Sequence, residues 1–190
     1  MGILLDHKKT IIAGFVLLVV ILGVAASAGG SLPGIFDLSR YFHVLAGVVW
    51  IGLLYYFNFV QVPSLGSVTP ETKADIFKEG NIVRRALFWF RWGAMFTLIF
   101  GLMLYDNLGG HGGDASWDIR IGALFGIIMW FNVWFIIWPN QKKVIGIDEA
   151  SADEKAAAGK KALMASRINT LLSIPMLFLM FSSTHFQIFG

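Results

Sequence analysis

Histidines are the side chains of this sequence best suited to hold a haem or a metal ion, because the chain has four of them and no cysteine. His43 lies near the start of the apolar segment 41–62, and His185 directly follows the apolar segment 163–184. An imidazole inside a membrane costs free energy unless it is hydrogen-bonded or coordinated. We therefore expect His43 to have a partner in the interior of the protein.

Five apolar segments must position these histidines: 10–28, 41–62, 86–105, 119–138 and 163–184. Each has about the 20 residues that a helix needs to cross the hydrocarbon core of a bilayer. Of all residues, 56% are hydrophobic and 14% are charged, which is not the balance of a soluble domain. The sequence predicts an all-α integral membrane protein with five transmembrane helices. Its basic residues lie at segment ends, which argues against nucleic-acid binding.

The chain is expected to form a single membrane domain, 1–190. Residues 1–37 are predicted to form an N-terminal helix or uncleaved anchor, and residues 38–190 a four-helix bundle of spans two to five. Such bundles commonly house cofactors between facing helices. The first segment has an alternative interpretation, since Lys8 and Lys9 precede it and small residues end it at Ala28, as in a secretory signal peptide.

The lysines and arginines divide unevenly between the two sides of these spans. Arg40 and Arg120 lie on one side; the other thirteen lie on the side of the N-terminus, namely Lys8, Lys9, Lys73, Lys78, Arg84, Arg85, Arg91, Lys142, Lys143, Lys155, Lys160, Lys161 and Arg167. Cytoplasmic segments carry the excess of positive charge in membrane proteins. The N-terminus is therefore predicted to be cytoplasmic and the C-terminus periplasmic.

In this orientation His43 and His185 reach the same periplasmic depth on two different helices. Haem b takes axial imidazole ligands in an apolar pocket, with its propionates near polar groups. We expect His43 and His185 to be the axial ligands. Arg40 and Arg120 are the periplasmic-side cations that can pair with propionates.

Helical spacing assigns one face of span two to the predicted site. That face contains His43, Gly47, Trp50, Leu54, Phe57 and Gln61, and the corresponding face behind His185 contains Phe181, Phe178, Ile174, Leu171 and Arg167. Gly47 lies one turn after His43 and leaves room for a flat ring or for a close approach of another helix. Trp50 supplies an apolar wall.

Two other interpretations of the histidines remain open. A histidine in a membrane can hydrogen-bond a neighbouring helix and coordinate nothing. Alternatively, His43, His185 and His111 could form a copper or zinc site made of histidines alone. His111 is surrounded by glycines, which is more typical of a loop residue.

A second group of polar residues lies deeper, toward the predicted cytoplasmic side: Asn58, Gln61, Arg91, Asn132, Arg167 and Asn169. Polar groups inside spans tend to face the bundle and mark sites, so an anion or polar-substrate pocket, or a propionate clamp for a second haem, is one interpretation. Hydrogen bonds between helices are the other. Two small-residue ridges, Gly93–Thr97–Gly101 and Gly122–Gly126, are predicted to allow close helix packing.

Three stretches, 41–61, 86–94 and 131–142, resemble the membrane domain of the bacterial membrane-bound urate hydroxylase family. More distantly, His43 with Trp50, Gly52, Leu53 and Tyr55 is similar to the first helix of the membrane protoporphyrinogen oxidases, a haem-binding family. The resemblance implies a redox module of the bacterial inner membrane in which His43, Arg91 and Asn132 match family positions. Urate hydroxylases also carry a c-type cytochrome domain, and without cysteine this chain would need a separate electron acceptor.

The function expected from these residues is that of a multi-pass, haem b-binding redox protein in contact with membrane lipid. It would oxidise a small, possibly urate-like purine or relay electrons to a separate periplasmic cytochrome c or respiratory partner. The alternative is a non-catalytic accessory subunit of a larger respiratory or oxidase complex. A transporter is a weaker option, because no inverted repeat is evident.

Overall fold

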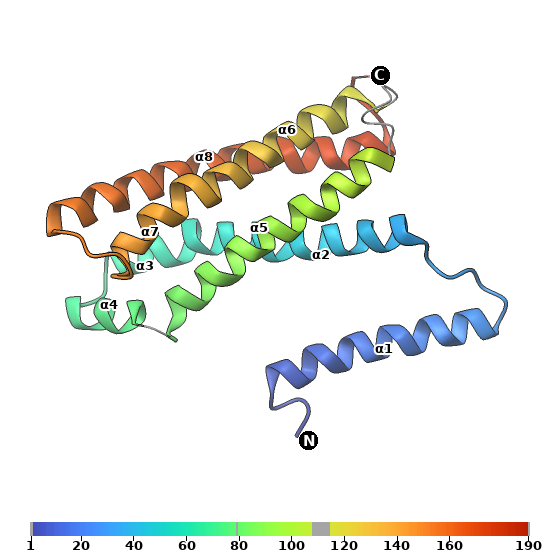
Figure 1. Ribbon diagram of the computed structural model, residues 1–190, viewed down its shortest axis with the longest axis horizontal. Coiled ribbons are helices and arrows are strands. Elements are labelled where there is room, and N and C mark those ends of the chain that lie inside the picture. The colour runs from blue at the N-terminus through green and yellow to red at the C-terminus, as the bar shows by residue number, and fades with distance from the viewer. Residues whose placement is uncertain (1, 79, 108–114, 190) are drawn as a thin grey trace. The chain divides into compact units, whose positions relative to one another are not determined.

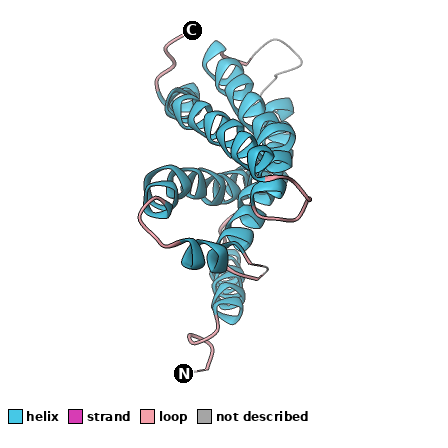
Figure 2. Cartoon of the chain, turned by 90° about the vertical axis from the view of Figure 1, so that its left-hand side faces the viewer, coloured by secondary structure: helices cyan, strands magenta, loops and turns pink. Residues whose placement is uncertain are grey.

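The computed structural model of the chain describes residues 2–78, 80–107 and 115–189, and every regular element in these ranges is helical (Figure 2). Within these ranges, five helical segments are long and apolar enough to cross a membrane: His7–Ser27, Ile35–Leu65, Ile82–Asp106, Trp117–Val144 and Ala152–His185. This confirms the all-helical class and the five predicted apolar helices. Each segment extends beyond the apolar stretch from which it was predicted, except the first.

The chain divides into two units, Met1–Leu38 and Ser39–Gly190. The first contains α1 (His7–Ser27), which has no buried residue. The side chain of Asp6 caps α1, since its Oδ1 accepts a hydrogen bond from the backbone N–H of Lys8 at 2.9 Å.

The second unit contains most of the helices, which Figure 1 labels along the chain. They are α2 (Ile35–Tyr55, which begins in the first unit), η1 (Tyr56–Gln61), α3 (Val62–Leu65), α4 (Pro70–Phe77), α5 (Ile82–Asn107), α6 (Trp117–Phe131), η2 (Asn132–Ile137), α7 (Trp138–Val144) and α8 (Ala152–His185). Helices α6 and α8 lie side by side (Figure 1).

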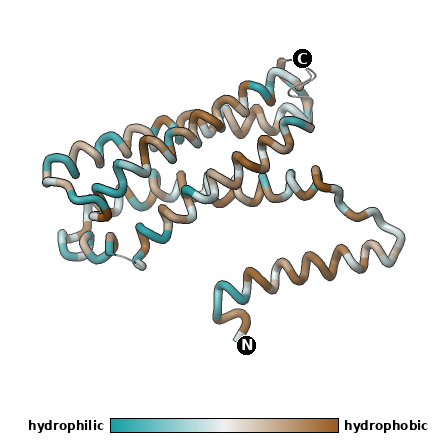
Figure 3. The backbone as a smooth tube through the Cα atoms, in the orientation of Figure 1, coloured by the Kyte–Doolittle hydropathy of each residue, from teal (hydrophilic) through white to brown (hydrophobic). Residues whose placement is uncertain are grey.

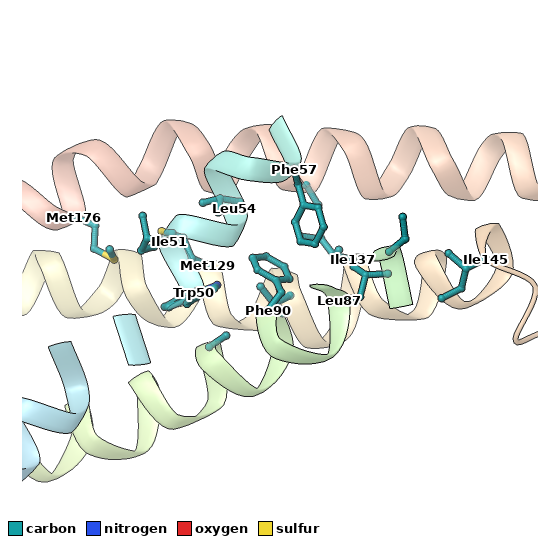
Figure 4. Packing of buried hydrophobic residues seen from close by; sticks show 14 residues of the cluster. Trp50, Ile51, Leu54, Phe57, Leu87, Phe90, Met129, Ile137, Ile145 and Met176 are labelled. Atoms are coloured by element: carbon teal, nitrogen blue, oxygen red, sulfur yellow. The ribbon is translucent and has the colours of Figure 1, made fainter. Parts of the chain in front are cut away.

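A single cluster of buried apolar residues joins α2, η1, α5, α6, η2 and α8 (Figure 4). Trp50 and Leu54 of α2 and Phe57 of η1, which helical spacing placed on one face, are buried in it. The ring of Phe57 meets the ring of Phe90 from α5 edge to face, with centroids 5.3 Å apart. The core extends from Met176 and Ile51 to Val83 and Ile145 near the ends of the spans, and it marks the faces that these helices turn inward.

Two of the spans contain a π-helical segment where the sequence predicted a regular helix. Segment η1 is followed by Pro63, and segment η2 by Pro139, each at the second residue of the next helix. Proline has no N–H, and its ring crowds the carbonyl group four residues earlier, which disfavours the regular α-helical turn. A wider turn relieves this crowding, and such turns are frequent at functional sites.

Small residues allow the close helix contacts that the sequence predicted. A Cβ atom on Gly93 of α5 would lie 3.2 Å from the backbone N of Trp50 in α2. On Gly122 of α6 it would lie 3.4 Å from Leu179 Cβ in α8. Both glycines are buried, so the helix backbones approach each other at these points.

Hydrophilic residues gather at the ends of the spans where α4, α7 and the start of α8 lie (Figure 3). Thr69 caps α4 by accepting a hydrogen bond from Thr72 N at 3.3 Å, and Pro70 is the first helical residue. Ser151 and Glu154 form a capping box that starts α8. Helix α8 thus continues the fifth span well beyond its apolar part.

Candidate functional site

His43 lies on α2 and is hydrogen-bonded to the neighbouring helix α5. Its Nδ1 is 2.8 Å from the backbone carbonyl oxygen of Thr97. Because a carbonyl oxygen can only accept, Nδ1 carries the hydrogen, and the lone pair of the neutral ring is on Nε2. Within the described residues Nε2 has no hydrogen-bond partner. This is the arrangement found in metal-binding histidines, in which the second nitrogen is fixed by a backbone carbonyl.

Glycine at position 101 makes this contact possible. A Cβ atom on Gly101 would lie 2.9 Å from Cε1 and 3.0 Å from Nδ1 of His43, closer than real Cβ contacts allow. The imidazole therefore packs directly against the backbone of α5. Thr97 turns its own hydroxyl away, toward the carbonyl oxygen of Gly93 at 2.7 Å. A Cβ atom on Gly47 would be 4.0 Å from the methyl group of Thr97, so Gly47 faces the same helix.

His185 lies on the exposed side of α8. Its ring stacks on the ring of Phe181, with centroids 4.0 Å apart, and its Nδ1 is 2.8 Å from the carbonyl oxygen of Phe181. Phe181 is 53% exposed and Leu171, further along the same face, is 68% exposed. His185 is thus exposed on α8 and not buried between helices, and its assignment as an axial ligand stays a prediction. The buried face of α8 carries small and polar residues instead, among them Ser182, Ser173, Asn169 and Ala165.

The other residues predicted to bind a metal or haem have no described contact with His43. His111 lies outside the described residues, and within the described residues no group of three metal-binding side chains is present. Arg40 is exposed on α2. Arg120 donates from Nε to the carbonyl oxygen of Ala115 at 2.9 Å, and its Cζ lies 5.3 Å from the centre of the Trp117 ring. Trp50 is buried against Gly93 in the core.

Four members of the predicted polar layer are buried or partly buried between helices. Asn132 Nδ2 donates to Asn169 Oδ1 at 2.8 Å, and Asn169 Nδ2 donates to the carbonyl oxygen of Met129 at 2.9 Å. Asn58 Nδ2 donates to Ser166 Oγ at 2.8 Å. Asn58 therefore links η1 to α8, and the Asn132–Asn169 pair links η2 to α8. Ser166 was not predicted, although its spacing of three from Asn169 places both near one face of α8.

Two amide oxygens of this layer, Asn58 Oδ1 and Gln61 Oε1, are buried without a hydrogen-bond partner among the described residues. Gln61 lines a partly open cavity of about 350 Å³, whose other lining residues come from α4 and from the ends of four spans. Its walls are mostly apolar, including Phe57, Phe77 and Phe90, with Gln141 and Ser166 among its polar residues. A cavity of this size is large enough for a small ligand.

The two arginines of the predicted layer lie apart from the asparagines. The guanidinium carbon of Arg91 lies 3.3 Å from the centre of the Trp138 ring. Arg167 is on the exposed face of α8. Sequence spacing did not indicate that Trp138, after the π-helical segment, would be the partner of Arg91.

The Asn132–Asn169 pair is expected to stabilise the helices that it joins. Asn169→Ala leaves the Asn132 amide and the Met129 carbonyl without this partner, at a cost of about 1–2 kcal/mol in the free energy of unfolding. Unfolding in mixed micelles with increasing dodecyl sulfate measures this cost. A double-mutant cycle with Asn132→Ala isolates the pair, and additive effects of the two substitutions would contradict the coupling.

Comparison with known proteins gives one match. A family model described as urate oxidase N-terminal matches residues 111–190, which include α6, η2, α7 and α8. No curated protein and no solved structure matches the chain. The match is consistent with the urate-related resemblance of the sequence, and it includes Asn132, Asn169 and His185 but not His43.

Proposed function

We propose that this chain is a multi-pass redox protein of the bacterial inner membrane that binds haem b through His43. In this proposal spans two to five form a bundle with a cytoplasmic N-terminus, and the protein oxidises a small urate-like substrate. Electrons pass to a separate periplasmic cytochrome or respiratory partner. The observation that carries the proposal is the hydrogen bond from His43 Nδ1 to Thr97, which leaves Nε2 as the donor atom for iron.

The residues around His43 fit a haem ligand in two respects. The Thr97 carbonyl fixes the tautomer, and the absence of a side chain on Gly101 leaves room for the ring against α5. A bound haem b supplies a one-electron iron centre whose potential depends on its axial ligand and on the polarity around it. His185 has a similar Nδ1 contact, but on the exposed side of α8, so the proposal rests on His43.

The urate-related part of the proposal is supported by the family match to residues 111–190 and by the resemblance of the membrane segments. Asn132 is one of the resembling positions, and its amide is held by Asn169. The role of Asn132 in the proposed protein is therefore to position η2 against α8. The side-chain oxygen of Gln61, which has no hydrogen-bond partner among the described residues, would accept from a substrate N–H group.

The test is a visible spectrum of the chain purified in mild detergent, together with its haem content. We expect a Soret band, a reduced-minus-oxidised spectrum of haem b, and reduction of the haem by urate in the absence of oxygen. If the chain binds haem but urate does not reduce it, the proposed substrate is wrong and the proposed haem binding stands. A chain without haem that migrates with a large complex on a native gel would favour the accessory-subunit function instead.

A further inference from the structure

Three arginines line a groove at the end of the spans that carries α4 and α7. Arg84, Arg85 and Arg91 come from the first half of α5, and Trp138 and Ile145 close the opposite side. The groove has a volume of about 370 Å³. No aspartate or glutamate is among the described residues that line it.

The positive charges of these arginines are not neutralised by carboxylates within the described residues. Arg84 donates from Nε to the carbonyl oxygen of Phe77 at 2.9 Å and from Nη2 to that of Ile145 at 3.0 Å, which are neutral acceptors. Arg91 lies flat on Trp138, a contact that occupies one face of the guanidinium group and leaves N–H groups at its edge. Arg85 is exposed. The groove therefore carries positive charge that the contacting carbonyl groups and the Trp138 ring do not neutralise.

The groove continues into an apolar surface of α5. Phe88, Trp89, Trp92 and Phe96 follow one another along this helix with exposed side chains, and we call them the aromatic stripe. Rings of neighbouring members contact each other, as in the pair Trp92 and Phe96 with centroids 5.9 Å apart. Arg91 lies nine residues after the start of α5, which is about 13 Å along the helix. A ligand in the groove thus has a polar end at the arginines and an apolar end along the stripe.

We propose that this groove binds the phosphodiester headgroup of an anionic phospholipid, whose acyl chains lie along the aromatic stripe. The guanidinium group presents N–H donors in a plane that matches the oxygen atoms of a phosphate. Basic pockets between transmembrane helices on the cytoplasmic side are known sites for such headgroups. A soluble anion would match the arginines but would not cover the exposed rings beside them. The site is separate from His43 and does not depend on haem binding.

The experiment compares the thermal stability of the full chain in two kinds of lipid nanodisc. One contains phosphatidylcholine alone, and the other contains equal parts of phosphatidylcholine and phosphatidylglycerol. We expect a higher Tm in the anionic discs, and we expect Arg85→Gln and Arg91→Gln each to reduce that increase by at least half. Each variant is compared with itself in the two lipids, so a change in its basal stability does not affect the result. Arg84 is left unchanged because it binds two backbone carbonyls.

The matched control is Lys160→Gln with Lys161→Gln, which removes two exposed positive charges of α8 that do not line the groove. This variant should keep the full increase in Tm. Equal loss in the control and in the arginine variants would overturn the proposal, since it would indicate general attraction of a basic protein to an anionic surface. An equal increase from inorganic phosphate in phosphatidylcholine discs would also overturn it, in favour of a soluble anion. The haem spectrum should be the same in both lipids.

Discussion

His43→Ala is expected to remove haem b from the purified chain, with loss of the Soret band and a haem content near zero. The reason is that the His43 ring packs against α5, with Nδ1 hydrogen-bonded to Thr97 and, among the described residues, no partner for Nε2. An axial imidazole supplies a direct bond to iron, and no cysteine is present to replace it. The measurement is the absorption spectrum with a quantitative haem assay on protein of equal monodispersity.

Two further variants separate ligation from simple damage to the fold. His185→Ala should retain the spectrum, because His185 is exposed and stacked on Phe181 of its own helix. Gly101→Ala keeps the imidazole but places a Cβ atom 2.9 Å from its Cε1, so the spectrum should shift or weaken. Gly52→Ala has open space around it and serves as the matched control. A normal spectrum for His43→Ala would contradict the assignment of His43.

Gly93→Leu is expected to have the largest effect on folding. The Cβ atom of any residue here lies 3.2 Å from the backbone N and 3.4 Å from the Cα of Trp50, and backbone atoms cannot move aside as a flexible side chain can. The rest of a leucine side chain must then separate α5 from α2. Overpacking of this kind costs about 1–3 kcal/mol or more in the free energy of unfolding.

The measurement is the midpoint of unfolding in dodecyl sulfate, together with the yield of folded protein. Gly52→Leu is the control, because it makes the same substitution on the exposed side of α2. Its midpoint should stay close to that of the unmodified chain. Equal destabilisation by the two substitutions would show that helix propensity, and not the contact with Trp50, determines the effect.

Hydropathy and length were sufficient to predict the helices, because a span must satisfy its backbone hydrogen bonds internally and needs about 20 apolar residues. The need of His43 for a partner was also predictable from the cost of burying an imidazole. The identity of the partner was not. Thr97 offers its backbone carbonyl, which every residue has, and Gly101 contributes by having no side chain.

The inward face of α8 could not be read from its apolar residues. In water, an apolar side chain indicates the core, but in a bilayer the lipid is as apolar as the protein interior. The phenylalanines at 178 and 181 therefore face outward, and Asn169 and Ser173 face inward. Small and hydrogen-bonding residues were the better signal for the interior of this helix, and they would have placed His185 on the outside.

The two π-helical turns have a consequence for the register of the spans that contain them. A π turn accommodates one more residue than an α turn, and one residue corresponds to a rotation of about 100°. In a regular helix an extra residue would rotate the rest of the span by this angle, but a wide turn takes up the extra residue within one turn. Deleting one residue between Tyr56 and Gln61 would therefore let the turn close to an α turn without rotating the two halves of the span relative to each other. Related sequences that lack one residue in this turn should thus present the same faces at both ends of the span.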